Sequence, residues 1–226
     1  MEKNKYYLIV NPHGGGGKGL AIKDKVLPIF EKSNSDMTII ETTHSGHAQE
    51  LAQSLDLNGY AGFLPIGGDG TMHEVVNGIL SRADNKRIPI GLITGGTGNS
   101  FMHDLDLLDP IEAAKVVVNG KIQSIDIASL RMSDTQTYCF NIVGWGLVTD
   151  ANIKAEYIRW LGESRYTISA AIEVIFKKKR FAKVAIDDKI IEGDILFVII
   201  CNTKHTGKGM KIAPKAVLND GLLDVV

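Results

Sequence analysis

The chain has 226 residues, of which 44% are hydrophobic and 23% charged, and its formal net charge is −1. This composition fits one large globular domain or two small ones, and the near-neutral charge gives no electrostatic footprint for nucleic acid. The apolar run after Lys5 is too short for a signal peptide, and no run approaches the ~20 apolar residues of a membrane-spanning helix. Cys139 and Cys201 lie in apolar runs, so we expect buried thiols in a reducing compartment and a cytoplasmic protein.

In the first half of the chain, apolar strand patterns alternate with amphipathic helix patterns. Pro28 predicts a kink in the first helix, and Asp109 followed by Pro110 is typical of a helix start. Alternation of strands and helices predicts a parallel sheet with right-handed crossovers, in an α/β domain that we place at residues 1–128. The predicted strands are 6–10, 37–43, 60–66 and 88–94, and the predicted helices are 19–33, 46–55, 71–82 and 109–120.

After about residue 128 the pattern changes. A strand is predicted at 135–146 and two helices follow, at 150–162 and 164–180. Strands joined by short turns predict antiparallel pairing. We therefore expect a β-rich second domain at residues 129–226, with later strands at 181–187, 189–193, 194–203 and 221–226.

Loops at the carboxyl ends of parallel strands carry the ligand sites of such sheets. Two of these loops are rich in glycine, NPHGGGGKG at 11–19 and TGGTGNSF at 94–101. Their backbone N–H groups can approach an anion such as phosphate, whereas a flexible turn, the alternative, needs only one glycine. The loop TTHSGHA at 42–48 supplies hydroxyl groups that serve either as helix caps or as nucleotide contacts.

The fourth loop, GGDGT at 67–71, places Asp69 between two glycines at the start of a predicted helix. An acid here is typical of a helix cap, but a cap does not require glycine on both sides. A general base needs open access to a substrate hydroxyl, and phosphoryl transfer uses such a base. The loop therefore predicts Asp69 as a catalytic base. Glu74 can reach back toward a metal or a neighbouring loop, and we interpret His73 as structural.

Basic residues of the second half allow two interpretations. Arg159 and Arg165 can bind phosphate oxygens if a break at Gly162 turns two helices toward one point, or they can lie on a solvated charged helix. The run KKKR at 177–180 could touch anionic lipid, but a solvated helix end is the favoured interpretation.

Together these motifs resemble the catalytic domain of the diacylglycerol, sphingosine and ceramide kinase superfamily. The strongest similarity is GGDGTMHEVVNG at 67–78, which looks most like the sphingosine kinase branch, and the segments 144–168 and 205–225 support it. The resemblance implies a Rossmann-like parallel-sheet domain of the NAD kinase and diacylglycerol kinase kind, followed by an antiparallel β-sandwich. It also implies an ATP- and Mg²⁺-dependent kinase that works at a membrane surface. Its substrate would be the primary hydroxyl of a sphingoid base, ceramide or diacylglycerol.

The resemblance also implies the site residues, although it assigns no metal ligand. Asp69 falls on the acid that deprotonates the lipid hydroxyl, and Asp126 falls on an acid that the diacylglycerol kinase branch uses near the site. The implied ATP-binding residues are Asn11, Pro12, His13, Gly14, Gly15, Thr42, Thr43, His44, Ser45, Gly46, Glu74, Gly96, Thr97, Gly98, Arg159 and Arg165. The implied substrate-binding residues are Gly67, Gly68, Asp69, Gly70, Asp150 and Asn152.

The sequence departs from the family pattern at several places. Asn152 stands where sphingosine kinases carry an acid for the sphingoid amine, and Ser100 stands where bacterial diacylglycerol kinases usually carry Asp. The chain ends at Val226, before a late acidic turn that returns to the ATP site in the family, so we expect a fragment or a shortened member. Two other functions stay open: an NAD kinase-like phosphotransferase, and a non-catalytic module that binds lipid or nucleotide. The oligomeric state and the particular lipid are not predicted.

Overall fold

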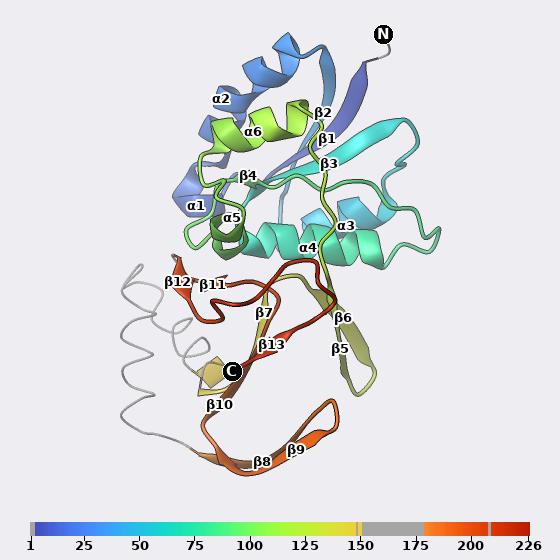
Figure 1. Ribbon diagram of the computed structural model, residues 1–226. Helices are drawn as coiled ribbons and strands as arrows, with labels where there is room; N and C mark the ends of the chain where they lie inside the picture. Colours follow the sequence, from blue (N-terminus) through green and yellow to red (C-terminus); the bar gives the residue numbers. More distant parts are fainter. Residues whose placement is uncertain (1–2, 148, 151–178, 208) are drawn as a thin grey trace. The chain divides into compact units, whose positions relative to one another are not determined.

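The computed structural model describes residues 3–147, 149–150, 179–207 and 209–226 (Figure 1). The chain divides into two compact units. The first comprises residues 1–141 and 202–222, and the second comprises residues 142–201 and 223–226. The domain boundary expected at residue 128 stays a prediction.

The first unit is built on a parallel sheet, which confirms the predicted fold class of this part of the chain. The sheet order is β2-β1-β3-β4, and every neighbouring pair is parallel. The carboxyl ends of all its strands therefore lie at one edge. The strands are β1 (Asn4–Val10), β2 (Ser35–Glu41), β3 (Tyr60–Gly67) and β4 (Ile93–Thr94), and the helices between and after them are α2 (Gly19–Lys32), α3 (His47–Ser54), α4 (Asp69–Leu80) and α6 (Pro110–Val118).

Helices cover both faces of this sheet (Figure 1). Along β1, Tyr6, Leu8 and Val10 pack into a buried cluster that includes residues of α2 and α6. The intervening Tyr7 and Ile9 pack into a second cluster with residues of α3 and α4. Successive side chains of a strand point to opposite faces, so a strand buried on both faces reads as a continuous apolar run.

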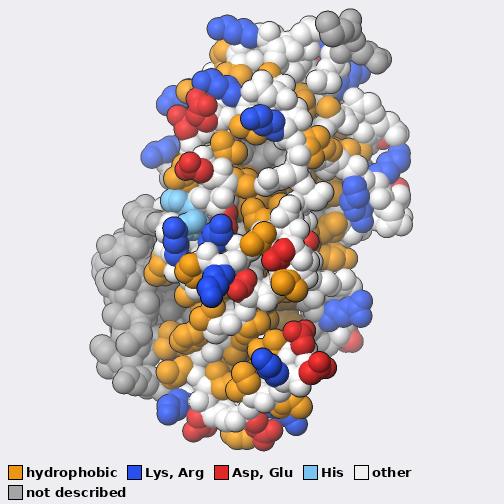
Figure 2. Space-filling view, in the orientation of Figure 1, with side chains coloured by type: hydrophobic (Ala, Val, Ile, Leu, Met, Phe, Trp, Pro, Cys, Tyr) orange, Lys and Arg blue, Asp and Glu red, His pale blue; other side chains and the backbone are white. Residues whose placement is uncertain are grey.

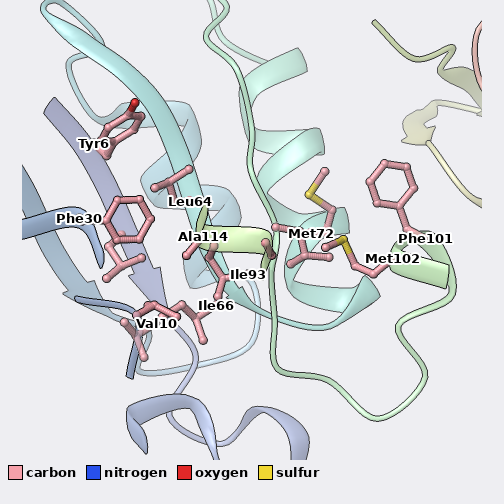
Figure 3. Close-up of a cluster of buried hydrophobic side chains, with 14 of the residues drawn as sticks. Tyr6, Val10, Phe30, Leu64, Ile66, Met72, Ile93, Phe101, Met102 and Ala114 are labelled. Carbon is pink, nitrogen blue, oxygen red and sulfur yellow. The ribbon is translucent and has the colours of Figure 1, made fainter. Parts of the chain in front are cut away.

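The first cluster also holds the short helix α5 (Ser100–Asp104) in place. Figure 3 shows Met72, Phe101 and Met102 close together beside α4. Phe101 meets Phe140 edge-to-face with ring centroids 5.1 Å apart, a favourable geometry for aromatic pairs. Buried apolar contacts thus fix α5 next to the ends of the sheet strands.

Two predicted strands differ in the structure. Regular pairing in the 88–94 segment is confined to β4 and is preceded by an isolated bridge between Phe63 and Ile90. The ladder is interrupted between them because the next donor on β3 would be Pro65, which has no N–H. The predicted strand 135–146 is two strands, β6 (Thr135–Cys139) and β7 (Ile142–Gly146). The strand is divided because its two parts pair with different partners, β6 with β5 and β7 with β10.

The sequence patterns missed two short helices. The glycine run forms α1 (Gly14–Gly17), whose backbone is irregular because Gly15 and Gly16 have positive φ angles. The end of the TGGTGNSF loop forms α5, after Asn99 in the left-handed conformation. Pro28 lies inside α2, which continues to Lys32.

The hairpin of β5 (Ala128–Met132) and β6 packs on α4 through a buried amide. Asn77 donates to the carbonyl of Tyr138 at 2.9 Å and accepts from its backbone N–H at 2.8 Å. The Asn77 side chain therefore replaces a neighbouring strand for this part of β6. The first unit also contains the small hairpin β11 (His205–Thr206) and β12 (Met210–Lys211).

The second unit is antiparallel where the structure describes it, as predicted. Its strands form a sheet of order β13-β10-β7 and the hairpin β8–β9, whose turn holds Asp187 at a φ of +50°. The predicted helices at 150–162 and 164–180 lie almost wholly outside the described residues. The remaining strands are β8 (Arg180–Ile186), β9 (Lys189–Ile195), β10 (Phe197–Cys201) and β13 (Asp224–Val225).

Within the described part of the chain, none of the helices combines the length and the apolar character that crossing a membrane requires. Cys201 is buried and Cys139 is half-buried, and burial raises the pKa of the Cys139 thiol. On the face drawn in Figure 2, acidic and basic side chains intermix with hydrophobic ones, as expected for a chain with a net charge of −1.

Candidate active site

Asp69 is the first residue of α4 and follows β3 after Gly68. Its side chain does not cap its own helix. Oδ2 accepts a hydrogen bond from the backbone N–H of Ser100 at 2.8 Å, and Oδ1 accepts one from Phe101 at 3.1 Å. Because these are the first N–H groups of α5, Asp69 closes the N-terminus of a different helix, where the helix dipole favours its charge.

This arrangement holds the Asp69 carboxylate in one orientation and leaves some of its lone pairs available to another donor. An ionised carboxylate has about four lone-pair sites, so two N–H bonds leave capacity for another donor. Asp69 is half-buried and Gly70 beside it is exposed. Asp69 can therefore cap α5 and also accept a proton from a hydroxyl that reaches it from the side of Gly70.

The glycines around Asp69 are glycine for different structural reasons. A Cβ on Gly96 would lie 2.4 Å from the Cα of Gly68, and a Cβ on Gly68 would lie 2.9 Å from the Cα of Gly96. Gly68 and Gly96 are therefore needed because the backbones of two loops touch. A Cβ on Gly70 would meet nothing within 4 Å among the described residues, so packing in that part of the chain does not explain this glycine.

The first glycine loop is tied to α4 and to the loop after β4. Asn11 donates from Nδ2 to Oγ1 of Thr71 at 3.3 Å, and its Oδ1 accepts from the backbone N–H of His13 at 3.0 Å. A Cβ on Gly15 would clash with the Gly95 carbonyl oxygen, whereas one on Gly16 would meet no described residue within 4 Å. The inner glycines thus serve packing, and the outer part of the loop has open space. Pro12 and Gly14 are half-buried, and His13 is exposed.

The second loop, Thr42 to Gly46, is held by Glu74. Glu74 accepts from the backbone N–H of Gly46 at 3.0 Å and from that of Ala48 at 3.2 Å, one on each carboxylate oxygen. Glu74 therefore closes the N-terminus of α3 just as Asp69 closes that of α5. Around this point Thr42 is buried, Thr43 contacts the rings of His44 and His47, and Ser45 is exposed.

In the third loop, Asn99 donates from Nδ2 to the Gly96 carbonyl at 2.8 Å. Its Oδ1 is buried and has no hydrogen-bond partner among the described residues. Thr97 is exposed and Gly98 is half-buried. A buried acceptor without a hydrogen bond costs free energy unless a further donor satisfies it. The unpaired Oδ1 of Asn99 therefore fits a ligand that binds at this edge of the sheet.

The parallel sheet thus brings Asp69, Glu74, Asn11 and the loops at 42–46 and 94–98 to one edge.

Asp150 belongs to the second unit, where both of its carboxylate oxygens accept hydrogen bonds from Nη2 of Arg180, at 2.9 and 2.7 Å. Arg159, Arg165 and Asn152 lie outside the described residues. Asp126 accepts from the backbone N–H of Gly221 at 2.7 Å through Oδ2. The roles assigned to all these residues stay predictions.

Among the described residues, no group of three or more His, Cys, Asp or Glu side chains is arranged to hold a metal ion. Mg²⁺ in phosphoryl-transfer sites is typically held by one or two carboxylates together with substrate phosphates. Asp69 fits that limited role, since it is the acid at the strand ends with an open neighbour.

Sequence reasoning missed one polar group beside this edge. Asp104, at the end of α5, binds the backbone N–H groups of Lys204 and His205 and the ring of His205. No local sequence pattern indicates this contact, because Lys204 and His205 follow Asp104 by 100 and 101 residues in the chain.

Comparison with known families identifies the fold. Residues 5–130 match the model of the diacylglycerol kinase catalytic domain. The chain belongs to this family. Residues 141–226 of this diacylglycerol kinase-family chain match the model described as the YegS C-terminal NAD kinase beta sandwich-like domain. The resemblance found in the sequence is thereby confirmed, and the matches do not favour the NAD kinase alternative.

Named relatives of this family member belong to two groups of lipid kinases. The chain is 34% identical over 182 residues to sphingosine kinase 1 of Arabidopsis thaliana, covering 76% of this chain and 37% of the relative. It is 30% identical over 223 residues to diacylglycerol kinase of Bacillus subtilis (strain 168), covering 97% of this chain and 72% of the relative. The chain thus spans well under half the length of the plant sphingosine kinase.

A solved structure supports the same assignment. The whole chain matches 73% of a diacylglycerol kinase from Bacillus anthracis str. Sterne, with 26% sequence identity and a TM-score of 0.79. This match, together with the β-sandwich model of the second half, confirms the predicted fold class: a parallel-sheet α/β domain followed by antiparallel β-structure.

Proposed function

We propose that the chain is the catalytic region of an ATP-dependent lipid kinase of the sphingosine and diacylglycerol type. The observation that carries this proposal is Asp69, oriented by two backbone N–H groups beside the open position of Gly70. A carboxylate held in this way can act as a general base, and the family supplies the reaction class.

In the proposed reaction Asp69 takes the proton of the lipid hydroxyl as that oxygen attacks the γ-phosphorus of ATP. The new O–P bond forms while the bond from the γ-phosphorus to the bridging oxygen breaks, and ADP leaves with that oxygen. General base catalysis contributes about 10²–10⁴ in rate. Positioning and charge neutralisation must supply the rest.

The loops at the same edge support a nucleotide site. No atom of the described residues lies within 4 Å of a Cβ placed on Gly16, Gly17 or Gly70, so a phosphate chain could approach the backbone there. Asn99 offers an unsatisfied oxygen in the third loop. Mg²⁺ would neutralise phosphate charge in this site, with Asp69 as a candidate ligand.

The acceptor is proposed to be a lipid, because the relatives are named for sphingosine, sphingoid bases and diacylglycerol. Such substrates reside in membranes, so we propose that the chain works at a membrane surface. Asn152 in place of an acid is a poor match for a cationic amine, which keeps neutral lipid alcohols among the acceptors to be compared.

The test is phosphate transfer from labelled ATP to sphingosine, ceramide, diacylglycerol and monoacylglycerol, with NAD⁺ as a separate acceptor. We expect one of the lipids to be phosphorylated and Asp69→Asn to lower turnover at least ~100-fold. Asp109→Asn is the matched control, since Asp109 is an exposed acid that caps α6 by accepting from the Ile111 N–H at 2.7 Å and belongs to none of the four loops assigned to the site. It is expected to keep full turnover.

Three results would contradict the proposal. Full turnover by Asp69→Asn would remove Asp69 from the chemistry. Transfer to NAD⁺ alone would favour the other kinase class. Tight Mg-ATP binding with no transfer to any lipid would favour a non-catalytic binding module. Thermal unfolding of each variant separates loss of the α5 cap from loss of the base.

A further inference from the structure

Two histidines stack on each other at the start of α3. The ring of His44 lies nearly parallel to that of His47, with centroids 4.8 Å apart and an angle of 12° between the planes. Gly46, at a φ of +88°, turns the chain sharply between them, a conformation that glycine adopts without strain. The backbone N–H of His47 donates to the carbonyl of His44 at 3.3 Å. The second loop therefore folds back over the first residue of α3.

The ring of His47 holds this loop through its Nδ1 atom. The backbone N–H of Thr43 donates to Nδ1 at 3.1 Å, and Oγ1 of Thr43 lies 3.3 Å from the same nitrogen. A ring nitrogen accepts a hydrogen bond only when it carries no proton, so this contact requires a neutral His47 with its proton on Nε2. A protonated His47 would turn an N–H toward the Thr43 N–H, and the bond would be lost.

His44 has surroundings of the opposite kind. Its Nε2 lies 3.3 Å from Oε1 of Glu50, and its Nδ1 lies 3.0 Å from Oγ1 of Thr43. Both of these oxygens can accept, so both ring nitrogens of His44 can donate, as they do in the charged imidazole. Two charged rings at this separation repel each other. A proton on His44 therefore disfavours one on His47.

The other charged groups near His47 act in both directions. Glu50 follows three residues later on α3, and Glu74 of α4 binds the backbone N–H groups on either side of His47. Both carboxylates favour a proton on the ring. The N-terminus of α3 and the neighbouring His44 oppose it. The Thr43 bond adds to the opposition, because it exists only with the neutral ring.

We propose that His47, in its neutral form, is the positioning residue of the second loop, and that protonation of its ring releases the loop and weakens nucleotide binding. The inference rests on the nucleotide site of the proposed function, to which the loop at 42–46 is assigned. His47 lies just outside that loop and acts on it through the Thr43 backbone, without contact to the nucleotide.

The test is the Mg-ATP affinity of the full 226-residue chain, measured by calorimetry from about pH 8 to about pH 5. The parent should lose about 5-fold in affinity as the pH falls, since one backbone hydrogen bond is lost. His47→Asn places Oδ1 near the position of Nδ1, so it accepts from Thr43 without titrating, and it should keep the high-pH affinity throughout. His47→Leu has no acceptor and should show the low-pH affinity throughout. Comparing proteins at the same pH cancels the titration of the nucleotide phosphates.

Two further variants assign the pH dependence to one ring. His44→Asn removes the neighbouring charge, so the loss of affinity should begin about 0.5 pH unit higher than in the parent. His73→Asn, the same change at an exposed histidine of α4, should alter neither the affinity nor its pH dependence. A loss that disappears in His44→Asn and persists in His47→Asn would overturn the role of His47.

Nitrogen NMR of the nucleotide-free chain reads the contact directly. At about pH 8 the proton of His47 should lie on Nε2, and a proton on Nδ1 would overturn the contact. The same pH dependence in the parent and in His47→Asn would also overturn the inference, as would a chain that binds no nucleotide at any pH. Of these results only the last one also removes the nucleotide site of the proposed function. The His47 role can thus fail while ATP is bound and lipid is phosphorylated.

Discussion

The two ends of α3 are closed by opposite charges that serve different purposes. At its N-terminus the Glu74 carboxylate accepts from Gly46 and Ala48. Beyond its C-terminus the Arg82 guanidinium donates from Nη1 to the carbonyls of Ala52, Gln53 and Leu55 at 2.8–3.0 Å. Both charges match the helix dipole, and both come from α4 or the residues just after it.

The difference between these ends lies in what surrounds them. Arg82 is 7% exposed and fully engaged, since Nε and Nη2 also bind both oxygens of Asp84. Glu74 is half-buried and lies at the edge that collects the glycine loops. A helix end closed inside the fold contributes stability, whereas one closed at a ligand edge also shapes a site. The following variants test this distinction.

The largest effect on stability is expected at Arg82. Arg82→Ala leaves three carbonyl groups at the end of α3 without their donor, and it takes the buried guanidinium away from Asp84. The free energy of unfolding should therefore fall by about 3 kcal/mol. Urea unfolding followed by far-UV circular dichroism measures this. ATP affinity of the folded fraction should not change.

Arg87→Ala is the matched control for Arg82→Ala. Arg87 is exposed and donates only to the carbonyls of Lys86 and Leu80 among the described residues, so the change should stay within about 0.5 kcal/mol. Equal losses for the two arginines would show that the α3 end does not depend on Arg82.

Glu74→Gln should have a smaller effect on stability and a visible effect on binding. The amide keeps one acceptor, but its NH₂ group faces a backbone N–H, so the unfolding free energy should fall by about 1.5 kcal/mol. Because Gly46 belongs to the second loop, Mg-ATP affinity should fall as well. A stability loss with unchanged ATP affinity would place this end of α3 in the same class as the Arg82 end.

Gly70→Ala separates access to Asp69 from packing. Alanine favours the helix over glycine, and its Cβ would meet none of the described residues within 4 Å, so the free energy of unfolding should rise by about 0.5 kcal/mol. If the open space serves a substrate, kcat/KM for the lipid should fall. In contrast, Gly96→Ala should destabilise, since its Cβ would lie 2.4 Å from the Gly68 Cα. Unchanged kinetics in Gly70→Ala would show that substrate does not use this space.

The smallest effect is a pH dependence at the Arg82 end. The hydrogen bonds from Arg82, and then the backbone N–H of Lys86, lower the pKa of Asp84 to about 2. A lowered folded-state pKa means that the contribution is present above the unfolded value near 4 and is lost as the pH falls toward 2. The difference in unfolding free energy between the parent and Asp84→Asn should therefore be constant above pH 4 and shrink below it. A difference that does not vary with pH would contradict the assignment.

Much of the fold was predictable because its signals are local. Apolar runs and amphipathic periods in residues 6–82 predicted the parallel order, and parallel order alone placed the glycine loops at one edge. The predicted strands at 88–94 and 135–146 were too long, because Pro65 on the neighbouring strand lacks a donor and because β6 and β7 pair with different strands.

The residues of the candidate site could be predicted from the sequence, but their hydrogen-bond partners could not. GGDGT predicted an important acid, but nothing near Asp69 in sequence indicates that its oxygens bind Ser100 and Phe101, more than 30 residues away. Asp104 carried no signal in sequence, and the segment from His205 onward indicated only the family, with no role for His205 itself. A polar side chain reveals its chemistry in sequence, but its partner is set by packing.

The sequence by itself determined the order of strands and helices, the glycine loops and the acid among them, because periodicity, turn residues and charge are properties of short stretches. Only the tertiary structure decided which helix end each acid closes. Asp69 binds α5, Glu74 binds α3, and Asp104 binds the β11–β12 hairpin. The reason is that an unsatisfied backbone N–H group takes the nearest buried acceptor in space, and that distance depends on the packing of the whole unit.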